Sequence, residues 1–187
     1  MNREQLISEA YLQEQQRLHA APRGYGGRGS KWATVVHEIM KEFSCCSMLD
    51  YGCGQGTLVQ GLQTFDRPER IFREYDPAIA GKEEPPAEPS DLVVCTDVLE
   101  HIESEKIHGV LTHVATLTGR VLFVVVSLVP TSKTLSDGRQ AHILLRSVEW
   151  WKFQLEDHGF LLSRTVKGRD PKKDHKQLAA VFIRCVK

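Results

Sequence analysis

Side chains that could move a proton or bind a ligand follow directly after the apolar run 91–96. Asp97, Glu100 and His101 are spaced i, i+3 and i+4, so a helix that begins at once would place all three on one face. A carboxylate beside a histidine can act in general acid–base catalysis, and His142 offers a second imidazole later in the chain. Glu100 would alternatively be an acid at a helix N-terminus, where the helix dipole favours it.

A second candidate site is the segment 47–58, whose sequence is SMLDYGCGQGTL. A short apolar run there ends in Asp50 and is followed by glycines at alternate positions, Gly52, Gly54 and Gly56. This pattern predicts a buried strand, a tight turn and the start of a helix. Glycine permits left-handed backbone angles and close approach of a ligand, and the first amides of the helix would face that ligand.

The spacing of these glycines argues against two common nucleotide sites. The dinucleotide fingerprint is G-x-G-x-x-G, whereas the glycines here stand at 52, 54 and 56. The phosphate-binding loop of nucleotide triphosphatases ends in Gly-Lys-Ser/Thr, and this turn continues instead as Gly56-Thr57-Leu58.

With its acid two positions before the first glycine, the segment 47–58 resembles the first motif of the class I S-adenosylmethionine-dependent methyltransferases. The segment 97–103, DVLEHIE, is similar to a second motif of that family. The resemblance extends from about residue 32 to the end and is strongest to the compact members found in bacteria and bacteriophages. It implies a methyltransferase with S-adenosylmethionine as the cofactor.

The resemblance also implies a role for individual residues. Glu74, at the end of a predicted strand, would bind the ribose hydroxyls, with Asp76 as the alternative, and Tyr75 would flank the adenine. A mobile loop before the first strand would cover the cofactor, and Lys31 or Arg28 would meet its carboxylate. The implied cofactor-binding residues are Lys31, Asp50, Gly52, Cys53, Gly54, Gly56, Glu74, Tyr75, Asp76, Thr96 and Asp97.

The acceptor of the methyl group is not specified by the sequence. An amine acceptor needs only a neutral lone pair, whereas a hydroxyl needs a base or a metal ion. We expect Glu100, His101 and His142 to be catalytic, and the long polar loop 127–146 to bind the substrate through Lys133, Arg139 and His142. The alternatives are a catalytically silent cofactor-binding protein and, less favoured by the glycine spacing, a dinucleotide-dependent oxidoreductase.

The set Asp97-x-x-Glu100-His101 with a later His142 is also similar to the metal site of the small-RNA 3′-terminal 2′-O-methyltransferases. Those enzymes have Glu at the first position and long RNA-binding additions, and this chain has neither. Many small-molecule methyltransferases have a similar Glu-His pair without a metal. We therefore expect no metal; if one binds, its ligands would be Asp97, Glu100, His101 and His142.

The elements that must position these residues form a doubly wound, mostly parallel α/β sheet of the Rossmann-like class. Helices are expected over about 3–19, 30–43 with Ser30 as the cap, 58–67, 107–118 and 147–158. Strands are expected near 47–51, 70–76, 91–96, 120–126, 161–167 and 178–186, and the resemblance makes the last pair, joined by a basic hairpin over 167–176, antiparallel. Gly81 and three prolines in 79–89 predict that the usual edge strand and its helix are missing.

Composition sets the remaining expectations. The 187 residues suit a single domain, with an N-terminal helix and covering loop over 1–31 and the core over 32–187. Lysine and arginine balance aspartate and glutamate at 24 each, so no global charge recruits nucleic acid. No signal peptide or membrane span is expected, and the five cysteines, an odd number without framework spacing, predict reduced thiols in the cytoplasm.

Overall fold

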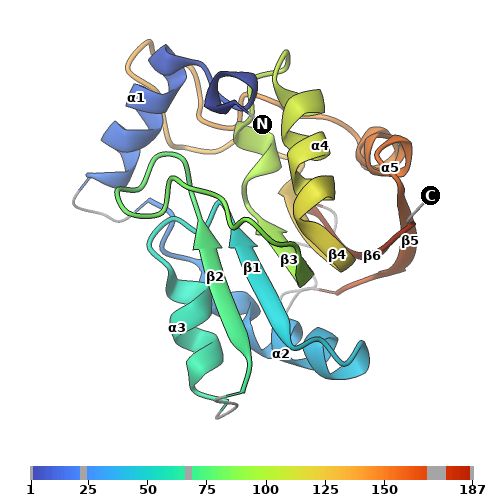
Figure 1. The fold of residues 1–187 in the computed structure, drawn as a ribbon. Coiled ribbons are helices and arrows are strands. Elements are labelled where there is room, and N and C mark those ends of the chain that lie inside the picture. The colour runs from blue at the N-terminus through green and yellow to red at the C-terminus, as the bar shows by residue number, and fades with distance from the viewer. Residues whose placement is uncertain (1, 22–24, 66–68, 168–175, 186–187) are drawn as a thin grey trace.

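A six-stranded sheet in the order β2-β1-β3-β4-β6-β5 runs through the computed structural model, which describes residues 2–21, 25–65, 69–167 and 176–185 (Figure 1). Its strands are β1 (Ser47–Tyr51), β2 (Ile71–Tyr75), β3 (Ser90–Thr96), β4 (Thr118–Ser127), β5 (Phe160–Thr165) and β6 (Gln177–Arg184). Strands β2, β1, β3 and β4 are parallel, and β6 is antiparallel to both β4 and β5. The expected Rossmann-like sheet with an antiparallel last pair is confirmed.

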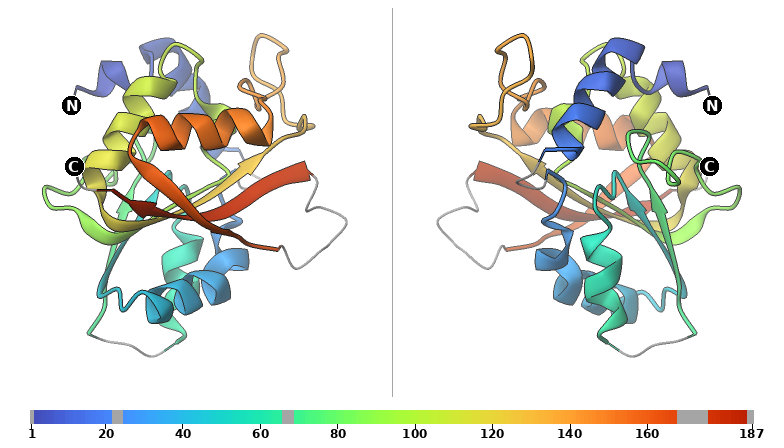
Figure 2. Two further views of the ribbon diagram at one scale, coloured as in Figure 1. Left: turned by 90° about the vertical axis from the view of Figure 1, so that its right-hand side faces the viewer. Right: turned by 90° about the vertical axis from the view of Figure 1, so that its left-hand side faces the viewer.

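Two helical layers cover the sheet (Figure 2). On one face lie α2 (Ala33–Glu42) and α3 (Thr57–Gln63), and on the other α4 (Ile107–Leu117) and α5 (Val148–Asp157). The central strand β4 shows why both layers are needed, because its apolar residues alternate between the two cores. Leu122, Val124 and Val126 belong to the core under α4 and α5, and Val121, Phe123 and Val125 to the core over α2 and α3.

The sheet ends at β2, as the prolines in 79–89 predicted. Residues 76–89 form turns and bends between β2 and β3, and β3 pairs directly with β1. The usual neighbour of β2 and the helix that would follow it are therefore missing from this segment. The expected basic hairpin over 167–176 lies largely in residues 168–175, outside the described part of the chain.

Three local expectations differ from the structure. The N-terminal helix is divided into a short 3₁₀ helix, η1 (Arg3–Gln5), and α1 (Glu9–His19), because Ser8 caps α1 by accepting from the Tyr11 amide. Ser30 does not cap the next helix; it lies inside a second 3₁₀ helix, η2 (Gly29–Trp32), which leads directly into α2. The helix expected after β3 is only a 3₁₀ turn, η3 (Leu99–His101).

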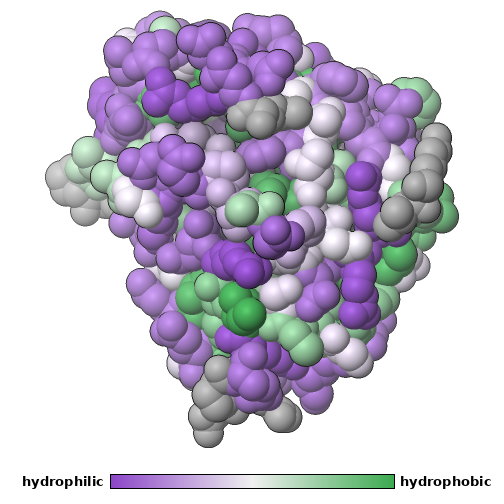
Figure 3. Space-filling view, viewed as in Figure 1, coloured by the Kyte–Doolittle hydropathy of each residue, from purple (hydrophilic) through white to green (hydrophobic). Residues whose placement is uncertain are grey.

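Helix α1 lies over the carboxyl ends of β1 and β2 (Figure 1) and belongs to a third, smaller core. That core joins apolar residues of α1 to Ala78, which follows β2, and to Leu135 and Ala141 of the long loop after β4. The outer face of α1 presents hydrophilic residues to solvent (Figure 3). In the described residues, none of the helices has the length and apolar content to cross a membrane.

Candidate active site

A cavity of about 620 Å³ lies at the carboxyl edge of the parallel strands, where ligands bind in doubly wound sheets. It brings together most residues that the sequence singled out, although they are separated by up to 111 positions. Those lining it are Lys31, Asp50, Gly52, Cys53, Tyr75, Asp76, Thr96, Asp97, Glu100, His101, Lys133 and His142. The expected site residues Gly54, Gly56, Glu74 and Arg139 are not part of its lining.

The glycine turn after β1 has the backbone that its sequence predicted. Gly52, Gly54 and Gly56 all have positive φ, at 73°, 51° and 71°. A Cβ on Gly52 would lie 2.5 Å from Val98 Cγ2, so neither the angle nor the space admits a side chain there. Of this turn, Gly52 and Cys53 line the cavity, whereas a Cβ on Gly54 or Gly56 would meet Gly26 or Glu74.

Three carboxylates surround this turn, and only two of them line the cavity. Asp76 accepts from the amides of Gly54 and Ala78, each at 2.9 Å, and its side chain lines the cavity. Glu74 instead forms an ion pair with Lys82 at 3.1 Å. Burial, reinforced by Glu74 and Asp76, raises the pKa of Asp50 to about 7. The geometry thus favours Asp76, the alternative from the sequence, over Glu74 for contact with a ligand.

Asp97 occupies a strained position immediately after β3, with φ at 57°. Its carboxylate forms an ion pair with Lys31 at 2.5 Å, and both side chains are about two-fifths exposed (41% and 37%). The 3₁₀ helix η2 therefore reaches across to the end of β3 through Lys31, and the lysine expected to meet a cofactor carboxylate contacts a protein carboxylate here. Arg28, the other candidate, also lines the cavity.

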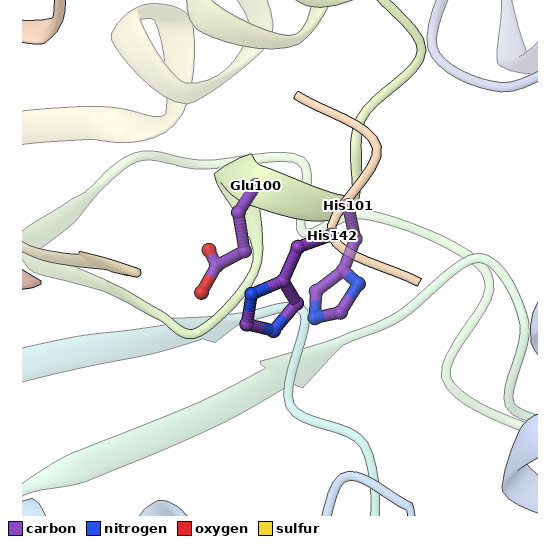
Figure 4. Close-up of side chains that lie close together, drawn as sticks. All are labelled: Glu100, His101 and His142. Atoms are coloured by element: carbon purple, nitrogen blue, oxygen red, sulfur yellow. The ribbon is translucent and has the colours of Figure 1, made fainter. Parts of the chain in front are cut away.

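Two histidines from distant segments meet in the cavity (Figure 4). The rings of His101 and His142 lie edge to face with centroids 4.8 Å apart. Nδ1 of His101 lies 2.7 Å from the Ala141 carbonyl, and Nδ1 of His142 lies 2.7 Å from the Val129 carbonyl. Since a carbonyl oxygen only accepts, each Nδ1 carries the proton, which leaves each Nε2 with its lone pair.

Tyr25 distinguishes the two histidines. Its hydroxyl lies 3.0 Å from Nε2 of His101 and 2.9 Å from Nδ1 of the same ring. Because that Nδ1 donates to Ala141, the tyrosine hydroxyl donates to Nε2. Burial, with a further contribution from His142, lowers the pKa of His101 to about 4, so this ring is a neutral and weak base. Tyr25 thus occupies Nε2 of His101, whereas no hydrogen bond engages Nε2 of His142 among the described residues.

Glu100 is fully buried beside these rings (Figure 4). Its Oε1 accepts from the Ser127 amide at 2.9 Å, and its Oε2 has no partner among the described residues. Burial, reinforced by Asp97, raises its pKa to about 8. The alternative of a solvated acid at a helix N-terminus is wrong, because the segment turns inward as a 3₁₀ turn. Ligand atoms of Glu100, His101 and His142 all lie within 4.8 Å of one another.

The two basic residues expected to bind substrate have different surroundings. Lys133 lines the cavity, whereas Arg139 forms an ion pair with Asp137 at 2.7 Å on the surface and lines another depression. Sequence reasoning missed the inward residues of α1, Tyr11, Gln15 and His19, which also line the cavity. The sequence predicted a helix over about 3–19, but nothing local to α1 indicates which surface it covers.

Comparisons with known proteins show the family and the fold. The model of the methyltransferase domain family matches residues 15–167. No curated protein matches the sequence. Many solved structures share the fold, among them 1,6-didemethyltoxoflavin-N1-methyltransferase from Burkholderia thailandensis with bound S-adenosylhomocysteine. That structure is 12% identical, with a TM-score of 0.61 over 86% of this chain and 80% of that one.

Two further structures resemble the chain at similar levels. Magnesium protoporphyrin IX methyltransferase from Synechocystis, with bound S-adenosylmethionine, is 16% identical, with a TM-score of 0.56 over 98% of this chain and 95% of that one. The methyltransferase domain of bacterial CtHen1-CN is 14% identical, with a TM-score of 0.58 over 82% of this chain and 97% of that one. At these identities the likeness is one of fold.

Proposed function

This chain belongs to the methyltransferase domain family, and from that premise we propose that it methylates a hydroxyl group of an acceptor, using S-adenosylmethionine as the donor and His142 as the base. The observation that carries the choice of a hydroxyl is the orientation of His142. Its Nδ1 proton is fixed on the Val129 carbonyl, so the Nε2 lone pair is available in the cavity. An amine acceptor would not require such a base.

The residues at one end of the cavity fit S-adenosylmethionine. Gly52 and Cys53 bring the backbone of the glycine turn to the cavity, and Asp76 offers a carboxylate for the ribose hydroxyls. Ala78 and Val98 provide apolar surface for the adenine, beside Tyr75. These groups would bind and orient the cofactor; Glu74, paired with Lys82, is assigned no contact with it.

When bound, S-adenosylmethionine supplies a methyl group on a sulfonium sulfur: the acceptor oxygen bonds to the methyl carbon as the carbon–sulfur bond breaks, and the electron pair stays on sulfur. The protein holds the two reactants close and in line, which lowers the entropic cost of the reaction. His142 Nε2 receives the hydroxyl proton. The Val129 carbonyl keeps the ring in the required tautomer and orientation.

His101, Tyr25 and Glu100 support this base. Tyr25 and the Ala141 carbonyl occupy both nitrogens of His101, which then packs edge to face against His142. Glu100 ties the turn after β3 to the end of β4 through the Ser127 amide, and its backbone carbonyl accepts from the Leu144 amide at 2.9 Å. Both loops that carry the histidines are thereby held together.

A divalent metal ion is the second candidate for activating the hydroxyl. The observation that favours it is the grouping of Glu100, His101 and His142, which could each contribute one ligand atom. Asp97, the fourth residue considered from the sequence, pairs with Lys31 through Oδ2 and does not belong to this grouping. Dependence of turnover on added metal would distinguish this candidate from the histidine base.

The test of the proposed function uses S-adenosylmethionine with a labelled methyl group. The protein is incubated with fractionated lysate, with and without chelator, and label is followed into each fraction. Wild-type protein should label an acceptor, and His142→Ala should bind S-adenosylhomocysteine normally and label it much less. Binding of cofactor without transfer to any fraction would instead indicate a silent cofactor-binding protein. A cytoplasmic location stays a prediction, supported by the five unpaired cysteines.

A further inference from the structure

Buried polar atoms without partners mark a part of the cavity that the proposed chemistry does not use. Tyr11 Oη and Gln15 Nε2 have no hydrogen-bond partner among the described residues, and both residues line the cavity. Tyr11 and Gln15 are more than nine-tenths buried, at 6% and 8% exposed. An unpaired buried polar group destabilises a fold, so each such group requires an explanation.

Tyr11 and Gln15 are one turn apart on α1 and share its inner face. Burial, reinforced by Glu103, raises the pKa of Tyr11, so its hydroxyl keeps its proton. The Gln15 side chain offsets part of that rise in pKa, but the Tyr11 hydroxyl and the Gln15 amide nitrogen form no hydrogen bond with each other or with another described group. The pair therefore presents two neutral donors to the cavity.

The surroundings of α1 place this pair on the side of the cavity that holds His142. Tyr11 packs in one apolar core with Leu135 and Ala141, and Ile143 packs against the same core, so both chain neighbours of His142 contact it. Polar contacts also join α1 to this loop, since Glu14 accepts from the Ser136 amide at 2.9 Å. Figure 2 shows the loop and α1 at the same end of the molecule.

Helix α1 also reaches the elements assigned to the cofactor, because Nε2 of His19 lies 3.9 Å from Oδ2 of Asp76 and Ala78 packs in the same core as Tyr11. The glycine turn, Asp76 and Asp97 stand at the ends of β1, β2 and β3, whereas Tyr11 and Gln15 come from α1. The charged groups that act on Tyr11 have other partners: Glu103 accepts from the amide and hydroxyl of Ser8 at 2.8 and 2.6 Å, Glu14 binds Ser136, and Arg139 pairs with Asp137. The inner face of α1 therefore offers a ligand two uncharged hydrogen-bonding groups, the Tyr11 hydroxyl and the Gln15 amide.

We propose that Tyr11 and Gln15 form the acceptor-binding subsite, and that the acceptor is a small, uncharged, polyhydroxylated molecule. Its oxygens accept from the tyrosine hydroxyl and the glutamine amide while a further hydroxyl faces His142. This inference rests on the proposed function, because the cavity must also hold the methyl donor. It adds a substrate class and two specificity-determining residues, neither of which takes part in proton transfer.

The experiment compares Tyr11→Phe and Gln15→Met with wild type. Gln13→Met on the exposed face of α1 is the matched control. Three quantities are measured: the thermal midpoint, the affinity for S-adenosylhomocysteine by calorimetry, and transfer of labelled methyl to two pools. One pool contains monosaccharides, methyl glycosides and inositols, and the other contains single-stranded RNA oligonucleotides.

We expect wild type and Gln13→Met to label the polyhydroxylated pool. Tyr11→Phe and Gln15→Met should label it at least about tenfold less, as for loss of a hydrogen bond to the substrate. Their thermal midpoints should be unchanged or higher, because an unpaired polar atom has been removed, and their affinity for S-adenosylhomocysteine should be unchanged.

Other results overturn the inference. A lower thermal midpoint in both variants would show that the two groups have structural partners, and weakened S-adenosylhomocysteine binding would assign the pair to the cofactor. Transfer to RNA, or to neither pool by a wild type that binds S-adenosylhomocysteine, would refute the substrate class. Failure of wild type to bind S-adenosylhomocysteine at all would refute the proposed function itself, which is a distinct result.

Discussion

The backbone of Gly26 lies directly against Gly54. The Gly26 carbonyl accepts from the Gln55 amide at 3.2 Å, and a Cβ on Gly54 would lie 2.7 Å from that carbonyl oxygen. The N-terminal loop and the glycine turn therefore meet backbone to backbone, next to the place assigned to the cofactor. Tyr25, the preceding residue, forms a hydrogen bond with His101. The dipeptide Tyr25-Gly26 therefore contacts both the glycine turn and the histidine pair.

The first prediction concerns this contact. Gly54→Val should weaken the binding of S-adenosylhomocysteine at least about tenfold, because the side chain would displace Gly26 and strain a backbone with positive φ. Gly81→Val is the matched control, since Gly81 also has positive φ, at 81°, but has no atom near its absent Cβ. Calorimetric titration measures both. Equal affinity in Gly54→Val and wild type would contradict the assignment of the turn to the cofactor.

The two acids at the end of β2 should differ in effect. Asp76→Asn should weaken S-adenosylhomocysteine binding about 10- to 100-fold, because a charged acceptor for the ribose hydroxyls is lost. Glu74→Gln should change affinity little, since Glu74 is paired with Lys82 outside the cavity. The same titration decides between them, and the reverse order of effects would restore Glu74 as the ribose acid.

Replacing His142 should separate binding from catalysis. His142→Ala should retain the affinity for S-adenosylhomocysteine and lower the rate of methyl transfer about 10²- to 10⁴-fold, as for loss of a general base. His108→Ala, on the exposed face of α4, is the control. Rates are measured with labelled donor under single-turnover conditions. An unchanged rate in His142→Ala would exclude the proposed base.

The buried Glu100 should make stability depend on pH. Its folded-state pKa of about 8 lies above the ordinary value of 4.5, so the folded protein holds a proton that the unfolded chain releases. This contribution is complete below pH 4.5 and is lost as the pH rises through 8. The free energy of unfolding of Glu100→Gln relative to wild type should therefore increase over that interval. Denaturant titrations at several pH values measure it, and a constant difference would show that Glu100 is ionised throughout.

A chelator distinguishes a histidine base from a metal ion at Glu100, His101 and His142. If His142 acts alone, excess EDTA should leave the rate of methyl transfer within about twofold of its value without chelator, because no bound ion contributes to activation of the hydroxyl. A rate that falls with EDTA and returns with added Mg²⁺ or Mn²⁺ would favour the metal. His101→Ala with retained Mn²⁺ binding, measured by calorimetry, would argue against a metal site at this cluster.

Much of the fold could be predicted from local sequence because its causes are local. Glycines at 52, 54 and 56 require a turn that other residues tolerate poorly, and the apolar run of β4 fits only a strand buried on both faces. The prolines in 79–89 cannot continue a helix or a central strand, and the loss of the edge strand followed from them.

The sequence predicted which residues would line the site better than it predicted which of them would contact one another. That Asp97, Glu100 and His101 follow a strand end placed them at the ligand edge, but their pairing depends on segments remote in sequence. Lys31 forms an ion pair with Asp97, and Tyr25 forms a hydrogen bond with His101. A hydrogen bond across such a separation leaves no periodic signal in either segment, so its partner can be known only from the packing.

The sequence by itself determined the strand–turn–helix at 47–58, the order of the strands along the chain and the residue types available at their ends, since backbone sterics and apolar periodicity act over a few neighbours. Only the tertiary structure decided that Asp76 and not Glu74 enters the cavity, that His142 joins His101, and that α1 closes over both. These choices depend on burial and on contacts between distant segments, which exist only after the chain has packed.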